Sequence, residues 1–272
     1  MNKVFRKVAL AVAFAGALAT APAMATPVFT VNSGSLGWAA SFNADFINGQ
    51  ATSMLQVIGD SVHISGHGYT LFTGFSLADN PISAFTTGLA PGSASSGYSL
   101  WAEYSFMTSL VSGTYAQPGS QYKIDSLSFS LWGEANNGIA NNSVFYAATL
   151  PDPLSASVTH SGDTKNLGNG TLISGSSTIN ANVGTSLNAT TAFALTSPDG
   201  ESFFVAPDPF YSLAFSSFTN TSQGFSPNAF GQVAINNASG GVDFNNVPEP
   251  GSLALLGLGL LGLAAARRRA VK

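Results

Sequence analysis

The sequence has no cysteine and little charge of either sign. Of the 272 residues none is Cys, and only 8% are Asp, Glu, Lys or Arg. The lack of Cys excludes disulfide bonds, thiolate nucleophiles and Cys-ligated zinc. The fold must therefore be stabilised by burial of a core. Hydrophobic residues make up 45% of the chain, which argues against disorder.

Positive charge is almost absent from the central part of the chain. Of the nine Lys and Arg residues only Lys123 and Lys165 lie within residues 26–246, which hold twelve of the thirteen acidic residues. Twelve negative charges against two positive ones give this part a net charge of −10. Nucleic-acid binding is not expected, since no cationic surface exists to replace the counterions of phosphates.

The N-terminus has the pattern of a secretory signal peptide. Three positive residues among the first seven precede an apolar stretch at residues 8–18. Ala23 and Ala25 then give the small-x-small pattern of a cleavage site. We therefore predict that residues 1–25 are a signal peptide and that the mature chain starts at Thr26.

The C-terminus combines a short motif, an apolar run and a basic cluster. The apolar run spans residues 251–266, about 24 Å at helical rise and slightly short of the usual membrane span. A short span favours a helix that is held briefly in the inner membrane and then removed; a permanent single-span anchor is the alternative. The motif is Val247, Pro248, Glu249 and Pro250, and the cytoplasmic stop is Arg267, Arg268 and Arg269.

These three parts, in this order, resemble the PEP-CTERM sorting signal of Gram-negative bacteria. The resemblance covers residues 247–272. It implies recognition by the membrane protease-transpeptidase exosortase, with cleavage near the Pro-Glu-Pro. It further implies cells that make exopolysaccharide, and a product that is secreted or held at the cell surface or in the matrix. It implies nothing about the activity of the body, since many unrelated bodies carry this signal.

A second set of short segments resembles the flocculation-associated members of the PEP-CTERM group. That resemblance implies a protein that retains cells within an exopolysaccharide matrix. The segments are Phe29-Thr30-Val31-Asn32, Phe203-Phe204, Pro209-Phe210-Tyr211 and Phe218-Thr219-Asn220-Thr221.

The residue pattern of the body, residues 26–246, predicts strands separated by turns. In the clearest strand, Leu127, Phe129 and Leu131 alternate with polar residues, and Ile124 and Trp132 fall on the opposite face. Gly, Pro and Asn clusters between such runs supply turns. We see no long amphipathic helix and no repeat. The sequence predicts a single all-β domain, a β-sandwich or jelly roll.

An aromatic segment near residue 207 is a possible glycan-binding platform. Aromatic faces on β-sheet loops can stack on sugar rings, and two prolines space these rings apart. The alternative is an ordinary core segment. The residues are Phe203, Phe204, Phe210 and Tyr211.

Catalytic patterns are weak in the body. Glu103, Glu134, Asp199 and Glu201 suggest a glycosidase, which needs two facing carboxylates, but the sequence does not show that any pair of them faces each other. The body has no Arg to orient an anionic substrate, and no Gly-x-Ser-x-Gly motif occurs. We predict no enzymatic activity and no cofactor, and keep a secreted hydrolase as the alternative.

Two patterns suggest metal binding without making a convincing site. His63 and His67 would share one side of a continuous strand, but Gly66 is expected to end that strand. Residues 162–170 loosely resemble a calcium loop, yet they offer one carboxylate, Asp163, and an internal Lys. We predict no metal site and leave calcium open against a polar hairpin loop.

These observations together predict an exported, exosortase-sorted protein that acts at the cell surface or in the matrix, in aggregation or biofilm formation. The expected partners are exosortase and exopolysaccharide. A secreted polysaccharide-binding module is the alternative.

Overall fold

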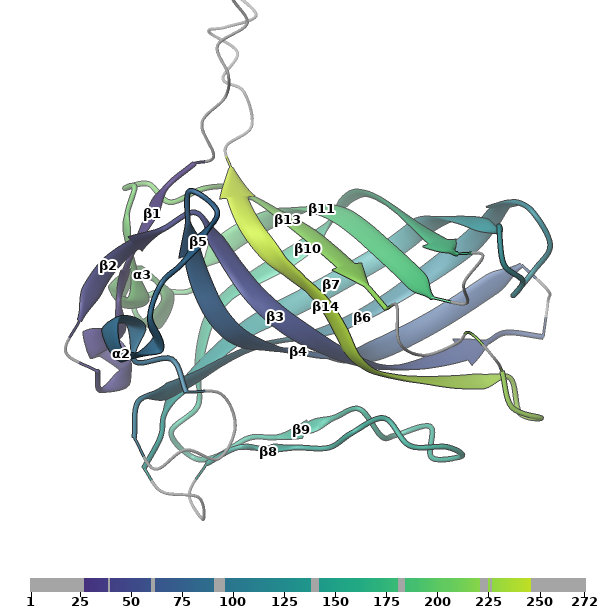
Figure 1. Ribbon diagram of the computed structural model, residues 1–272, viewed down its shortest axis with the longest axis horizontal. Coiled ribbons are helices and arrows are strands. Elements are labelled where there is room, and N and C mark those ends of the chain that lie inside the picture. The colour runs from purple at the N-terminus through teal and green to yellow at the C-terminus, as the bar shows by residue number, and fades with distance from the viewer. Residues whose placement is uncertain are drawn as a thin grey trace, which may run out of the picture.

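The computed structural model describes residues 27–38, 40–59, 62–90, 96–137, 142–180, 184–220, 225 and 227–245. Eight long antiparallel strands wind into one closed sheet (Figure 1). They are β3 (Phe46–Val57), β4 (His63–Leu77), β6 (Tyr98–Ser112), β7 (Gln121–Ala135), β10 (Lys165–Ile179), β11 (Thr185–Leu195), β13 (Leu213–Thr219) and β14 (Gln232–Asn245).

Each of these strands pairs with the next along the chain, and β14 pairs with β3 to close the barrel. A short strand, β5 (Asn80–Pro81), extends the end of β4. The prediction of a single all-β domain is confirmed, but the strands form one closed barrel instead of the two sheets of a sandwich. Bulges at several pairings bend the long strands, and such bends allow a twisted sheet to close on itself.

Alternation along each strand separates an apolar interior from a polar exterior, and bulges shift this alternation. In β7, Leu127, Phe129 and Leu131 point inward as predicted. Ile124 was expected on the opposite face but is fully buried against Leu127. The pairing jumps between Met107–Ser126 and Thr108–Ile124, so Asp125 is an extra residue. That bulge returns Ile124 to the inside.

One end of the barrel is closed by a small sheet that we call the plug. Its strands are β12 (Phe204–Ala206), β1 (Phe29–Asn32) and β2 (Ser41–Ala44), in that order. Three short helices lie at the same end (Figure 1). They are η1 (Ser33–Leu36), α2 (Ala84–Thr87) and α3 (Asp199–Phe203).

The plug also holds both ends of the described chain. The rings of Phe29, in the first strand, and Phe244, near the end of the last, lie 5.3 Å apart. Asn245 is therefore at the plugged end. The hairpin turn between β6 and β7 lies at the opposite end (Figure 1).

A segment that we call the strap, residues 142–164, runs along the outside of the barrel (Figure 1). It contains the two-residue strands β8 (Val144–Phe145) and β9 (Val158–Thr159). The ring of Phe145 packs 5.3 Å from the rings of both Tyr69 and Trp101. The strap therefore covers aromatic residues that point outward from the barrel wall.

Candidate functional site

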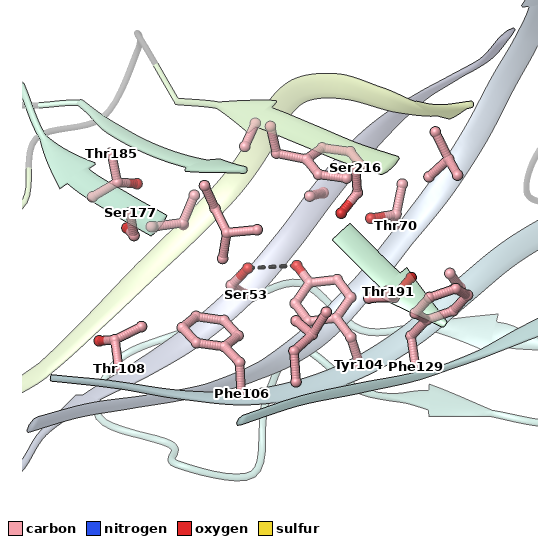
Figure 2. Close-up of a pocket in the computed structure, with 18 of the residues that line it drawn as sticks. Ser53, Thr70, Tyr104, Phe106, Thr108, Phe129, Ser177, Thr185, Thr191 and Ser216 are labelled. Carbon is pink, nitrogen blue, oxygen red and sulfur yellow. Dashed lines mark hydrogen bonds between the residues drawn. The ribbon is translucent and has the colours of Figure 1, made fainter. Parts of the chain in front are cut away.

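The barrel encloses a cavity of about 110 Å³, lined by residues of all eight strands (Figure 2). It extends from Ile47 and Phe244 near the plug to Ile179 and Phe225 at the other end. Eight-stranded barrels have an interior just wide enough to be filled by side chains or to hold one small ligand. No charged side chain lines the cavity in the part of the chain that the structure describes.

The polar groups of the cavity are hydroxyls, and several of them bond to the barrel itself. Thr108 donates to the carbonyl of Ile64 at 3.2 Å, and Thr191 donates to the carbonyl of Ala214 at 3.1 Å. These bonds satisfy the two hydroxyls within the wall. The cavity is consequently more apolar than its residue types suggest.

One hydroxyl pair stands out near the middle of the cavity. Figure 2 shows Ser53 and Tyr104 pointing toward each other, with 2.6 Å between their oxygens. The Tyr104 hydroxyl also lies 3.3 Å from the carbonyl of Thr52. Burial raises the pKa of Tyr104 to about 12, with a smaller opposing effect of the Ser53 hydrogen bond. The phenol therefore stays neutral at physiological pH.

A second concave region lies on the outer face of the sheet, and we call it the outer groove. Its volume is about 560 Å³, and strands β10, β11, β13 and β14 form its floor. Hydroxyl and amide side chains line it beside two partly buried aromatic rings, those of Phe46 and Phe215. The outward polar side chains are Ser174, Ser176, Asn188, Thr190 and Ser217.

The outer groove also contains one carboxylate, that of Asp243. It lies directly opposite Phe215 in the pairing of β13 with β14. Its Oδ1 is buried and accepts no hydrogen bond among the described residues. Burial raises the pKa of Asp243, and the charge of Asp45 adds to this effect. The groove thus combines aromatic rings, hydroxyls, amides and one carboxylate.

The four aromatic residues predicted as a glycan platform belong to the plug. Phe203 and Phe204 are 0% and 2% exposed, so neither offers a free ring face. Phe210 and Tyr211 are partly buried and pack against the same core. The Phe210 ring lies 5.0 Å from Phe204 and 5.2 Å from Phe244. Phe203 and Phe204 therefore belong to an ordinary core segment, the alternative to a glycan platform, because closing the barrel end requires large apolar side chains.

Glu103 and Glu134, two of the four carboxylates considered for a glycosidase, do not face each other. Glu103 pairs with Ser130 and Glu134 with Ser99 on the adjacent strands β6 and β7. An offset of four residues corresponds to about 13 Å along a strand, whereas paired glycosidase carboxyl groups lie closer.

Each carboxylate has a local role in holding the strap. Glu134 is fully buried and accepts bonds from the Ser143 amide and hydroxyl, at 2.8 and 2.7 Å, and from the Ser161 hydroxyl at 2.7 Å. Glu103 is hydrogen-bonded to His160 of the strap and accepts a bond from the Trp101 indole at 3.0 Å. Both contacts tie the strap to the barrel wall.

The residues considered for metal binding are also dispersed. His63 and His67 lie on one continuous strand, β4, so the expectation that Gly66 ends the strand is wrong. Within the resolved ranges of the structure, no group of three or more His, Asp or Glu is arranged to hold a metal. Asp163 contacts Asn137, while Asn166 and Asn169 lie in β10 and bond to each other.

Comparison with known families gives one match, at the C-terminus. Residues 246–269 match the family model described as the PEP-CTERM protein-sorting motif. The chain carries a PEP-CTERM sorting signal. This signal supports an exported protein that is sorted by exosortase, with a transiently membrane-anchored, secreted or surface state. No curated protein and no solved structure matches the chain.

The sorting motif and the predicted signal peptide lie outside the described residues. This holds for Ala23 and Ala25, for residues 247–250 and for Arg267, Arg268 and Arg269. Among the residues that are described, no helix has the length and apolarity needed to cross a membrane.

Sequence reasoning missed both concave regions of the barrel. Tyr104 and Ser53 sit on different strands, and so do Phe46, Phe215 and Asp243. The available signal was local: Phe215 and Asp243 each occur at an outward position of an alternating strand. Which strands are neighbours decides whether such residues meet, and the pattern does not contain that information.

Proposed function

We propose that this protein acts outside a Gram-negative cell, at its surface or in its matrix. There it would be a non-enzymatic component of cell aggregates, flocs or biofilm, in contact with exopolysaccharide. The observation that carries the proposal is the sorting motif at residues 246–269. Proteins with this signal are delivered beyond the inner membrane of cells that make such polymers.

The outer groove supports the contact with polysaccharide. Hydroxyl and amide side chains can exchange hydrogen bonds with sugar hydroxyls, and an aromatic face can pack against the apolar face of a sugar ring. The carboxylate of Asp243, which lines the groove and is partly buried, adds an acceptor group for sugar hydroxyls. The net negative charge of the body favours a neutral or weakly charged polymer over a strongly acidic one.

The sorting step is tested by changing Pro248 and Pro250 together to Ala. We expect the variant to stay with the inner membrane, with its C-terminus intact by mass spectrometry, because exosortase no longer recognises it. The control changes two exposed prolines of the body, Pro81 and Pro153, to Ala, and should be processed normally. Normal processing and release of the motif variant would contradict the sorting step.

The polysaccharide contact is tested by retention of the exported protein on the purified matrix polymer. Phe215→Ala should weaken retention roughly threefold to tenfold, since it removes one aromatic contact. Phe230→Ala is the matched control, because Phe230 is 71% exposed and lies in the turn before β14, outside the groove. Lack of retention of the unmodified protein, or equal retention of a folded Phe215→Ala variant, would remove this part of the proposal.

The hydrolase alternative has less support. Its candidate carboxylates Glu103 and Glu134 are separated along the strands, and Glu134 is fully buried beneath the strap. Polymer breakdown by the purified protein that Glu103→Gln abolishes would revive this alternative.

A further inference from the structure

The interior cavity is the feature of the molecule that sorting and polysaccharide contact leave unexplained. A barrel whose only task is to display an outer surface gains stability from a solid core, since unfilled space forfeits packing contacts. Small residues point inward where larger ones would fill the space. Ala51 and Ala102 line the cavity from β3 and β6.

The chemistry of the lining defines what the cavity can accept. Ile, Leu, Val and Phe side chains surround it, and no charged group of the described chain faces it. A charged ligand would lose its hydration without gaining a partner, which is strongly unfavourable. Any ligand that fits this cavity must therefore be uncharged and mainly hydrocarbon.

The Ser53–Tyr104 pair supplies one polar contact at mid-length. Its hydroxyls bond to each other at 2.6 Å, and either can act as donor. A ligand hydroxyl or carbonyl can therefore join this pair without leaving a buried polar group unsatisfied. Tyr104 lies on β6 between the inward residues Ala102 and Phe106, so hydrocarbon would contact the wall on both sides of the polar atom.

The size of the cavity sets the scale of the ligand. Apolar cavities of about 150 Å³ stay dry and bind benzene, and this cavity measures about 110 Å³. We propose that the barrel interior is a binding site for a small, uncharged, hydrocarbon-rich molecule with one hydroxyl or carbonyl oxygen, which bonds to Ser53 and Tyr104. This site is separate from the outer groove and does not depend on the polysaccharide contact.

The test compares hexan-1-ol with hexanoate, two probes with the same chain length and different charge. Binding to the purified exported protein is followed by methyl chemical shifts of Ala51 and Ala102 in nuclear magnetic resonance. Hexan-1-ol should bind saturably and shift both methyl groups, and hexanoate at pH 7 should not. Absence of saturable hexan-1-ol binding, or equal binding of the two probes, would overturn the proposal.

Variants locate the site. Ala102→Phe and Ala51→Leu, on different strands, should each abolish hexan-1-ol binding by filling the cavity. Ala194→Phe, at an exposed position of β11, is the matched control and should bind normally. Undiminished binding in a cavity variant that retains the native circular dichroism spectrum would place the ligand elsewhere.

Tyr104→Phe tests the polar contact. It should weaken hexan-1-ol binding roughly threefold to tenfold, the usual effect of one hydrogen bond. Benzene, which makes no such bond, should bind the variant within about twofold of the unmodified protein. An equal loss for both probes would assign Tyr104 a purely structural role and remove the hydroxyl or carbonyl from the description of the ligand.

Discussion

At the scale of the residue, Asp243 on the barrel wall carries a cost in stability. Its carboxylate lines the outer groove, and one of its oxygens is buried without a hydrogen-bond partner among the described residues. A charge held in that way costs stability.

Asp243→Asn is expected to change stability in a pH-dependent way. Burial raises the pKa of Asp243 above its ordinary value of 3.8. Between the ordinary and the raised pKa the folded state binds more protons than the unfolded state, so the Asp243 contribution falls as pH rises. The substitution should therefore stabilise the protein at neutral pH, and the gain should shrink as pH falls toward 3.8.

Urea denaturation of both proteins at several pH values between about 3 and 7 measures this difference. A constant difference across that range would show that the Asp243 carboxyl titrates alike in the folded and unfolded states. If Asp243 also serves the groove, the more stable variant should be retained less well on the matrix polymer.

At the scale of the element, backbone proximity between strands limits what a position tolerates. In β4, a Cβ added at Gly68 would lie 2.0 Å from the carbonyl oxygen of Thr52 in the neighbouring strand β3. A Cβ added at Gly74 in the same strand meets nothing within 4 Å. Only the first glycine is required by the pairing of the two strands.

We therefore expect Gly68→Ala to lower the free energy of unfolding by about 1–3 kcal/mol, the usual cost of overpacking. Gly74→Ala should leave it unchanged or raise it by up to about 1 kcal/mol. Chemical denaturation of both variants gives the comparison. Equal effects at the two positions would mean that the strands can separate at Gly68 without cost.

The strap depends on one buried carboxylate. Glu134→Gln replaces an acceptor of three short bonds, from the Ser143 amide and from the hydroxyls of Ser143 and Ser161, by an amide that must also donate. The free energy of unfolding should fall by about 1.5–3 kcal/mol. Hydrogen exchange should accelerate in the strap before it does in the barrel strands.

Glu201→Gln provides the control, since Glu201 is exposed on α3 and should change stability by less than about 0.5 kcal/mol. A Glu134→Gln variant with unaltered exchange in the strap would show that the aromatic contacts of Phe145 hold the strap without the carboxylate.

At the scale of the whole molecule, the plug joins the first and last described strands. Phe29 is fully buried, and its ring contacts Phe204, Phe210 and Phe244 at 5.8, 6.3 and 5.3 Å. The closed end of the barrel therefore forms only when the first and last described strands pack together. This places Asn245, the last described residue before the sorting motif, beside the plug.

Phe29→Ala should consequently destabilise the whole barrel by about 3–5 kcal/mol, as expected for a fully buried ring. Phe85→Ala, at a position 86% exposed on α2, should have an effect below about 0.5 kcal/mol. Thermal and urea denaturation measure both. A small effect of Phe29→Ala would show that the plug contributes little to the folding of the barrel.

The sequence by itself determined the all-β class, through residue alternation of period two, and the cellular address, through the C-terminal sorting signal. Both are local properties, readable within about 25 neighbouring residues. The same local reading failed at Ile124, where one extra residue reverses the pattern. It left Phe203 and Phe204 open between a binding platform and an ordinary core segment, because their aromatic character fits both.

Only the tertiary structure decided that the strands close into one barrel, and with that closure came the interior cavity and the outer groove. Closure rests on the pairing of Ile47 with Val242, residues far apart in the chain. Alternation assigns each side chain to a face of its own strand, but it does not specify the neighbouring strand. The groove residues Phe46, Phe215 and Asp243 come together for that reason, through pairings that no local pattern encodes.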